Sequence, residues 1–203
     1  MILFPLFRIP FVRATPGLAA YRRGPHRVFV CNHVSLLDTI FVASVLWSHG
    51  RSPILVLGDA SVWRRSALSR FLSSRVGYLL ERGRLNKLRI QELRAFGASV
   101  AAFELLVFPE GTRGDGLSVK PCQPGIFYIA REARAPIVPV FIENMQLLST
   151  KTSGFHPLRG LRKVVIRFGA AIEPEEYLEL DRADLTELVR RRLEQLAPGP
   201  PAP

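Results

Sequence analysis

Short apolar runs alternate with segments of helical periodicity along most of the chain. Alternation of this kind predicts an α/β fold, in which helices pack on the faces of a β-sheet. Helical spacing of apolar residues predicts helices at 36–48, 62–74, 86–103 and 124–132, and one or two more helices at 175–196. The apolar runs predict strands at Arg27–Cys31, Pro53–Gly58, Gly77–Glu81, Leu105–Phe108, Pro136–Ile142 and Val164–Phe168.

The 203 residues suffice for one domain of ordinary size. Residues 25–197 hold the alternating pattern, and 198–203 are expected to form a frayed tail. Residues 1–24 form an apolar and basic segment, whose apolar part, Met1–Val12, is shorter than the about 20 residues that span a bilayer. This segment either packs against the core or contacts a membrane interface. The side chains available for such a contact are Phe4, Leu6, Phe7, Ile9 and Phe11.

The basic excess lies entirely in the first half of the chain. The formal net charge is +11; residues 1–100 hold 15 Lys and Arg against four acidic residues, and residues 101–203 hold 13 of each. This bias predicts an anionic partner, although a basic surface kept for solubility remains an alternative. Elements for reading nucleic acid are missing, so a nucleic acid is not expected. Cys31 and Cys122 form no ligand cluster, which disfavours a zinc site or a disulfide framework and favours a reducing compartment.

Polar residues follow the first predicted strand, where Asn32–Asp38 (NHVSLLD) leads into a predicted helix. Ligand sites in α/β sheets gather at the carboxyl ends of strands. In one continuous helix His33 and Asp38 would lie about 140° apart and would not meet. If His33 lies in the loop and Asp38 in the first helical turn, Asp38 accepts from one imidazole nitrogen and leaves the other basic. The alternative is a capping box in which Ser35 and Asp38 serve the helix alone.

A second polar segment, Phe108–Arg113 (FPEGTR), also follows an apolar strand. Its proline and glycine are typical of a tight turn. Arg113 is suited to gripping a phosphate through two hydrogen bonds, Thr112 offers a hydroxyl, and Glu110 offers an acceptor for a substrate hydroxyl. The alternative is a polar surface turn with an ion pair.

Together the two segments resemble the glycerolipid acyltransferase family typified by 1-acylglycerol-3-phosphate acyltransferase. That family carries an NHxxxxD block and, further along the chain, an FPEGTR block, and both are complete here. Two weaker blocks also match, Gly77–Arg82 and Ile137–Val140, so the resemblance covers residues 28–140. It implies a single-domain α/β fold with a mixed, mostly parallel sheet flanked by helices.

The resemblance implies an O-acyltransferase of phospholipid biosynthesis. The enzyme would move a fatty acyl group from acyl-CoA or acyl-carrier protein to the hydroxyl of 1-acylglycerol-3-phosphate, giving phosphatidic acid. The alternatives are another lysolipid acceptor, either a lysophospholipid or a lyso-aminolipid, and a non-enzymatic basic scaffold on membranes. The expected location is peripheral, on the cytoplasmic face of an anionic membrane. Besides the acyl donor, no cofactor and no metal are expected.

The resemblance also assigns roles to individual residues. His33 would remove the proton of the acceptor hydroxyl, and Asp38 would orient the imidazole. Glu110, Gly111 and Thr112 would shape the acceptor site. The cations expected to hold the acceptor phosphate are Arg82, Arg113 and Lys120, the last because Gln123 stands where the family often has a lysine.

Overall fold

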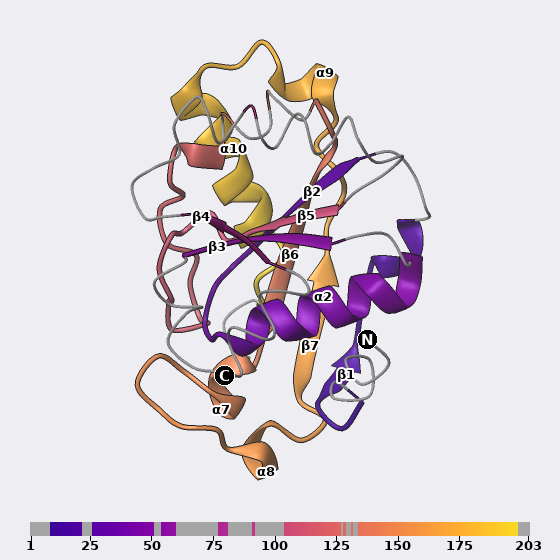
Figure 1. Cartoon of the computed structure of the whole chain (residues 1–203), viewed down its shortest axis with the longest axis vertical. Coiled ribbons are helices and arrows are strands. Elements are labelled where there is room, and N and C mark those ends of the chain that lie inside the picture. Colours follow the sequence, from indigo (N-terminus) through magenta and orange to yellow (C-terminus); the bar gives the residue numbers. More distant parts are fainter. Residues whose placement is uncertain are drawn as a thin grey trace.

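The computed structural model describes residues 9–21, 26–50, 54–59, 77–80, 91, 104–126, 128, 131 and 134–198. These residues include one seven-stranded sheet with the strand order β1-β7-β6-β2-β5-β3-β4 (Figure 1). Neighbouring strands run parallel, except for the antiparallel pair β6 and β7. The predicted α/β fold with a mixed, mostly parallel sheet is confirmed.

The predicted strands are found within one residue of their expected bounds, and one further strand, β1, precedes them. The strands are β1 (Val12–Ala14), β2 (Arg27–Cys31), β3 (Ile54–Asp59), β4 (Gly77–Leu80), β5 (Glu104–Val107), β6 (Ile137–Glu143) and β7 (Val164–Phe168). The helices that the structure describes over their full length are η1 (Leu18–Ala20), α2 (Leu37–Gly50), α7 (Met145–Leu148), α8 (Pro157–Gly160), α9 (Pro174–Tyr177) and α10 (Arg182–Glu194).

Three predicted helices lie partly or wholly outside the described residues. The helices expected at 62–74 and 86–103 fall there, apart from residue 91, which is helical. Of the helix expected at 124–132, the described residues 125, 126, 128 and 131 are helical. The segment 175–196, expected to form one or two helices, forms two, α9 and α10. None of the helices in the described part of the chain is long and apolar enough to cross a membrane.

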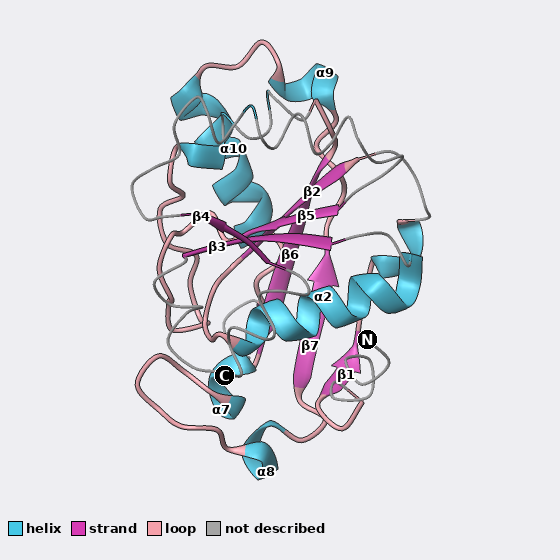
Figure 2. Cartoon of the chain, in the orientation of Figure 1, coloured by secondary structure: helices cyan, strands magenta, loops and turns pink. Residues whose placement is uncertain are grey.

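Strands β2, β5, β6 and β7 are buried on both faces, which explains why they read as continuous apolar runs. Side chains of β2 alternate between two clusters: Phe29 and Cys31 join one, and Val28 and Val30 join the other. Helix α2 covers the first face with Phe41, Val42, Val45 and Leu46. Helix α10 covers the second with Leu185, Val189 and Leu193, and Figure 2 shows the sheet between these two helices.

The strand order brings the two polar segments of the sequence together. Strands β2 and β5 are parallel neighbours, with Val30 paired to Val107. Their carboxyl ends therefore meet at one edge of the sheet, which is the edge where ligand sites form in α/β proteins. Residues Asn32–Asp38 and Phe108–Arg113 leave the sheet at this edge.

The N-terminal segment packs on the core over its described part. Strand β1 pairs with β7, and Phe11 is buried, with its ring centroid 6.0 Å from that of Phe41. The sheet thus takes in residues from the predicted segment 1–24. Ile9 is exposed, so its contact with a membrane interface stays a prediction. Phe4, Leu6 and Phe7 lie outside the described residues.

Glu104 at the start of β5 is a buried carboxyl group, and burial raises its pKa to about 7 against the opposing effect of Arg27. Because folding raises this pKa, ionisation of Glu104 lowers the free energy of unfolding. The contribution of Glu104 to stability is therefore greatest at low pH and is lost as pH rises through about 7. We expect Glu104→Gln to gain melting temperature over the wild type at pH 8 but not at pH 5.

Thermal unfolding of both proteins at the two pH values measures this difference. The control is Glu187→Gln, because Glu187 is exposed and Arg190 lowers its pKa, away from this pH range. Its effect on the melting temperature should be the same at both values. A Glu104→Gln effect that does not change with pH would contradict the prediction.

Candidate active site

His33 and Asp38 meet at the carboxyl end of β2. The Nδ1 atom of His33 lies 2.9 Å from Oδ2 of Asp38, and the Asp38 side chain is fully buried. A carboxylate in this position favours the tautomer that carries hydrogen on Nδ1. The other ring nitrogen, Nε2, is then an acceptor for a proton. Helix α2 begins at Leu37, so His33 lies in the loop and Asp38 in the first turn, the arrangement that the pairing requires.

Asp38 also orders the loop that carries His33. Its Oδ2 accepts hydrogen bonds from the backbone N–H groups of Val34 at 2.6 Å and Ser35 at 2.8 Å. The Ser35 hydroxyl in turn accepts from the N–H of Leu37. One half of the predicted capping box is present, since Asp38 accepts from the Ser35 N–H, while the Ser35 hydroxyl accepts from Leu37 and not from Asp38. Imidazole orientation and this helix-start contact therefore occur together. The Asp38 carboxylate therefore both holds the backbone at the start of α2 and orients the His33 imidazole.

Two further residues hold the His33 loop, and sequence reasoning gave neither of them a role. The Phe108 ring stacks on the imidazole, with 4.3 Å between the ring centroids. The buried Asn32 side chain clamps β2 to β6, because it donates to the Ile142 carbonyl at 3.2 Å and accepts from the Ile142 N–H at 2.7 Å. Both belong to the sequence blocks, and that membership was the only signal that could have found them.

Glu110 joins the two loops. It is 2 % exposed, its Oε1 accepts from the His33 N–H at 3.0 Å, and its Oε2 accepts from the Lys120 N–H at 3.4 Å. Burial raises the pKa of this carboxyl, and the two backbone donors oppose the rise. Sequence reasoning gave Glu110 a substrate hydroxyl to bind. In the structure its oxygens instead accept from the backbone, which favours a positioning role.

The turn after Glu110 is packed tightly against the His33 loop. Gly111 has φ +64°, a left-handed conformation that favours glycine. The Gly114 N–H donates to the His33 carbonyl at 2.6 Å, and a Cβ on Gly114 would lie 3.2 Å from Oε2 of Glu110. The Lys120 ammonium donates to the Arg113 carbonyl at 3.0 Å. The expected convergence of the two loops is found.

The remaining predicted residues differ in what the structure says of them. Thr112 is exposed and Arg113 is partly buried, both on the turn that contacts the His33 loop. The Lys120 ammonium donates one hydrogen bond within that turn, to the Arg113 carbonyl. Arg82 lies outside the described residues. Of the three predicted cations, Arg113 and Lys120 are thus described, and both belong to the segment that contacts the His33 loop.

Cys31 directly precedes this site and belongs to the core. Its thiol is fully buried, and burial raises its pKa well above the ordinary value, with Asp38 adding to the rise. It lies 3.7 Å from the Asn32 side-chain oxygen. A thiol held protonated is a poor nucleophile. This environment fits a residue that fills the core.

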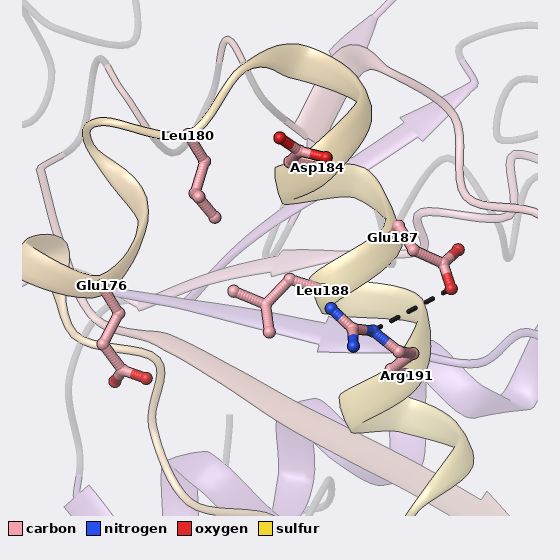
Figure 3. A pocket seen from close by; sticks show the side chains of 6 residues that line it. All are labelled: Glu176, Leu180, Asp184, Glu187, Leu188 and Arg191. Atoms are coloured by element: carbon pink, nitrogen blue, oxygen red, sulfur yellow. Dashed lines mark ion pairs between the residues drawn. The ribbon is translucent and has the colours of Figure 1, made fainter.

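A hollow of about 470 Å³ lies elsewhere, between α9 and α10 (Figure 3). None of the predicted site residues lines it. Its wall carries three carboxylates and one guanidinium, which disfavours an anionic acceptor there. The lining residues are Glu176, Leu180, Asp184, Glu187, Leu188 and Arg191. Among the described residues, no group of three or more His, Cys, Asp and Glu side chains is arranged to hold a metal ion.

The fold and the paired loops define an α/β protein with a carboxylate-oriented imidazole at the carboxyl edge of a mostly parallel sheet. Such an imidazole is suited to removing a proton from a hydroxyl group. The family model described as Acyltransferase matches residues 16–143. The chain belongs to that acyltransferase family, which confirms the resemblance seen in the sequence.

Curated relatives carry the name 1-acyl-sn-glycerol-3-phosphate acyltransferase. One from Cocos nucifera is 26% identical over 132 residues, which cover 62% of this chain and 40% of the relative. One from Saccharomyces cerevisiae is 29% identical over 171 residues, 82% of this chain and 54% of the relative. The chain thus spans about half the length of the curated relatives that it matches.

A solved structure shares the fold. The crystal structure of the 1-acyl-sn-glycerophosphate (LPA) acyltransferase PlsC from Thermotoga maritima superposes with a TM-score of 0.62 at 20% identity. The match covers 95% of this chain and 75% of that chain. The similarity therefore extends beyond the sequence blocks to nearly the whole chain.

Proposed function

We propose that this chain is an O-acyltransferase that makes phosphatidic acid from 1-acylglycerol-3-phosphate. The acyl donor is a thioester, either acyl-CoA or acyl-carrier protein. The observation that carries the proposal is the 2.9 Å contact between Nδ1 of His33 and Asp38, made where the Phe108–Arg113 turn meets the His33 loop. The names of the curated relatives support the same chemistry.

The imidazole acts as general base. Nε2 of His33 takes the proton of the acceptor hydroxyl as its oxygen bonds to the thioester carbonyl carbon. Asp38 stabilises the imidazolium that forms. The tetrahedral intermediate then collapses, the carbon–sulfur bond breaks, and the thiolate takes the proton from the imidazolium. The products are phosphatidic acid and a free thiol, and no enzyme nucleophile takes part.

Cations near His33 supply the means to hold an anionic acceptor. Arg113 and Lys120 lie on the turn that contacts the His33 loop, and Arg82 remains a third candidate from the sequence. Thr112 and Gly111 lie on the same turn. A phosphate held there presents the neighbouring glycerol hydroxyl to His33, an entropic advantage of fixed geometry.

We further propose that the enzyme works at the surface of an anionic membrane, on its cytoplasmic face. The excess of 11 positive charges in the first half of the chain supports attraction to such a surface. Both the acceptor and the product are lipids, so a surface enzyme meets them in place. Beyond the acyl donor the mechanism uses no cofactor.

The test is product analysis with purified protein. We expect incubation with 1-acylglycerol-3-phosphate and either acyl-CoA or acylated acyl-carrier protein to yield phosphatidic acid. Mass spectrometry detects this product. A panel of other lysolipids at the same concentration measures acceptor choice. Faster transfer to a lysophospholipid or a lyso-aminolipid would reassign the acceptor. No transfer to any acceptor from either donor would overturn the proposal.

A further inference from the structure

Four of the exposed large apolar side chains gather at one end of the molecule, around α8. Ile9 is 64% exposed, Phe155 48%, Leu158 85% and Leu161 47%; we call these four residues the α8 patch. Hydrogen bonds join its two segments, since the Arg162 N–H donates to the Pro10 carbonyl at 2.9 Å. Figure 1 shows α8 at the lower end of the view, beyond the sheet and next to β1.

Packing of α8 on α7 holds the side chains of the patch on the surface. The segment 144–163 contains the short helices α7 and α8, which are packed on each other. A Cβ on Gly160 would lie 2.7 Å from Leu148, which is fully buried, and the His156 N–H donates to the Leu148 carbonyl at 2.8 Å. One side of α8 is therefore anchored, and Leu158 is held outward on a firm support.

Cations surround the patch and acids are absent from its main segment. Residues 144–163 contain no Asp or Glu and four Lys or Arg residues, all of them exposed. Arg13 on β1 is a further exposed cation. Apolar side chains set among cations match the boundary between the headgroups and acyl chains of an anionic bilayer. The four cations are Lys151, Arg159, Arg162 and Lys163.

The patch lies at the same edge of the sheet as His33. Helix α7 follows the carboxyl end of β6, which Asn32 clamps to β2. The Gln146 side chain of α7 lies 2.7 Å from where a Cβ on Gly116 would stand, and Val34 lies beside the same point. Because α8 packs on α7, a surface that contacts the patch also faces the edge with the active-site loops.

We propose that the α8 patch docks the protein on anionic bilayers, with Leu158 and Leu161 entering the headgroup boundary. A protein partner is disfavoured by size, because four side chains cover much less than the roughly 800 Å² per partner of a stable interface. The docking itself does not depend on the reaction. The benefit of bringing His33 to a lipid substrate rests on the proposed function.

The test measures binding of the full chain to vesicles without any lysolipid. Vesicles of phosphatidylglycerol and phosphatidylcholine are compared with vesicles of phosphatidylcholine alone by co-sedimentation. We expect wild-type binding to favour the anionic vesicles and to weaken with salt. The double variant Leu158→Glu, Leu161→Glu should lose at least about tenfold in partitioning, because two leucines no longer leave water.

The matched control is Ala183→Glu, an exposed position on α10 that adds the same kind of charge away from α8. It should bind as the wild type does, and all variants should keep the wild-type melting temperature. Wild-type binding to neither vesicle, equal binding to both, or undiminished binding of the double variant would each overturn the proposal.

An activity comparison separates this proposal from the proposed function. On a dispersed short-chain acceptor the double variant should turn over like the wild type, and on acceptor in anionic vesicles it should be slower. Loss of vesicle binding in a protein that shows no transfer would support docking and reject the reaction. Equal rates of both proteins on vesicles would reject the benefit of docking for catalysis.

Discussion

Replacing His33 by alanine is expected to lower turnover by ~10²–10⁴-fold, the usual contribution of a positioned base. The imidazole is the group that Asp38 orients, and its ring lies against Phe108 at the edge of the sheet. The backbone contacts of His33 do not involve its ring, so the loop keeps its bonds to Glu110 and Gly114. Turnover at saturating acceptor and donor, with a melting curve, measures the effect.

His49→Ala is the matched control, because His49 is an exposed histidine in the last turn of α2. It should leave turnover unchanged. A His33→Ala protein that turns over like the wild type would exclude the general-base mechanism. If Asp38 acts through His33, combining His33→Ala with Asp38→Asn should cost far less than the product of the two single losses.

The inner strands of the sheet were predictable because β2, β5, β6 and β7 are buried on both faces. Val28, Phe29 and Val30 of β2 are all fully buried, so the sequence carries an unbroken apolar run that local reasoning detects. Strand β1 has three residues and only partly buried or exposed side chains. Its pairing with β7 sets it in place, and no local pattern reports a partner some 150 residues away in the chain.

The active-site pair was predictable for a different reason. His33 lies in the loop before α2 and Asp38 in the first turn of α2, so their contact depends only on local geometry at the start of one helix. The role of Glu110 depends on the order of strands β2 and β5, which places its carboxylate against a backbone group 77 residues earlier. Sequence reasoning named the residue from its block but could not find its hydrogen-bond partners. Long-range pairing decided its role.

Glu110→Ala is expected to damage both stability and catalysis. The buried carboxylate accepts from the His33 and Lys120 N–H groups, and hydrogen bonds to a charged group contribute about 1.5–3 kcal/mol each. We expect the free energy of unfolding to fall by about 2–4 kcal/mol, less than the sum of two such bonds because the bond from the Lys120 N–H is long at 3.4 Å. The His33 loop loses its link to the Phe108–Arg113 turn, and a misplacement of about 1 Å costs turnover of order 10²-fold.

Glu104→Gln separates this positioning role from the general cost of altering a buried glutamate. Glu104 and Glu110 flank opposite ends of β5, and only Glu110 bonds to the His33 loop. Glu104→Gln should leave turnover as it is. For Glu110→Gln, whose amide replaces one acceptor by a donor, we expect lower turnover together with a lower melting temperature. If instead the acceptor KM rose sharply while the melting temperature held, Glu110 would bind the substrate hydroxyl directly and the positioning role would fail.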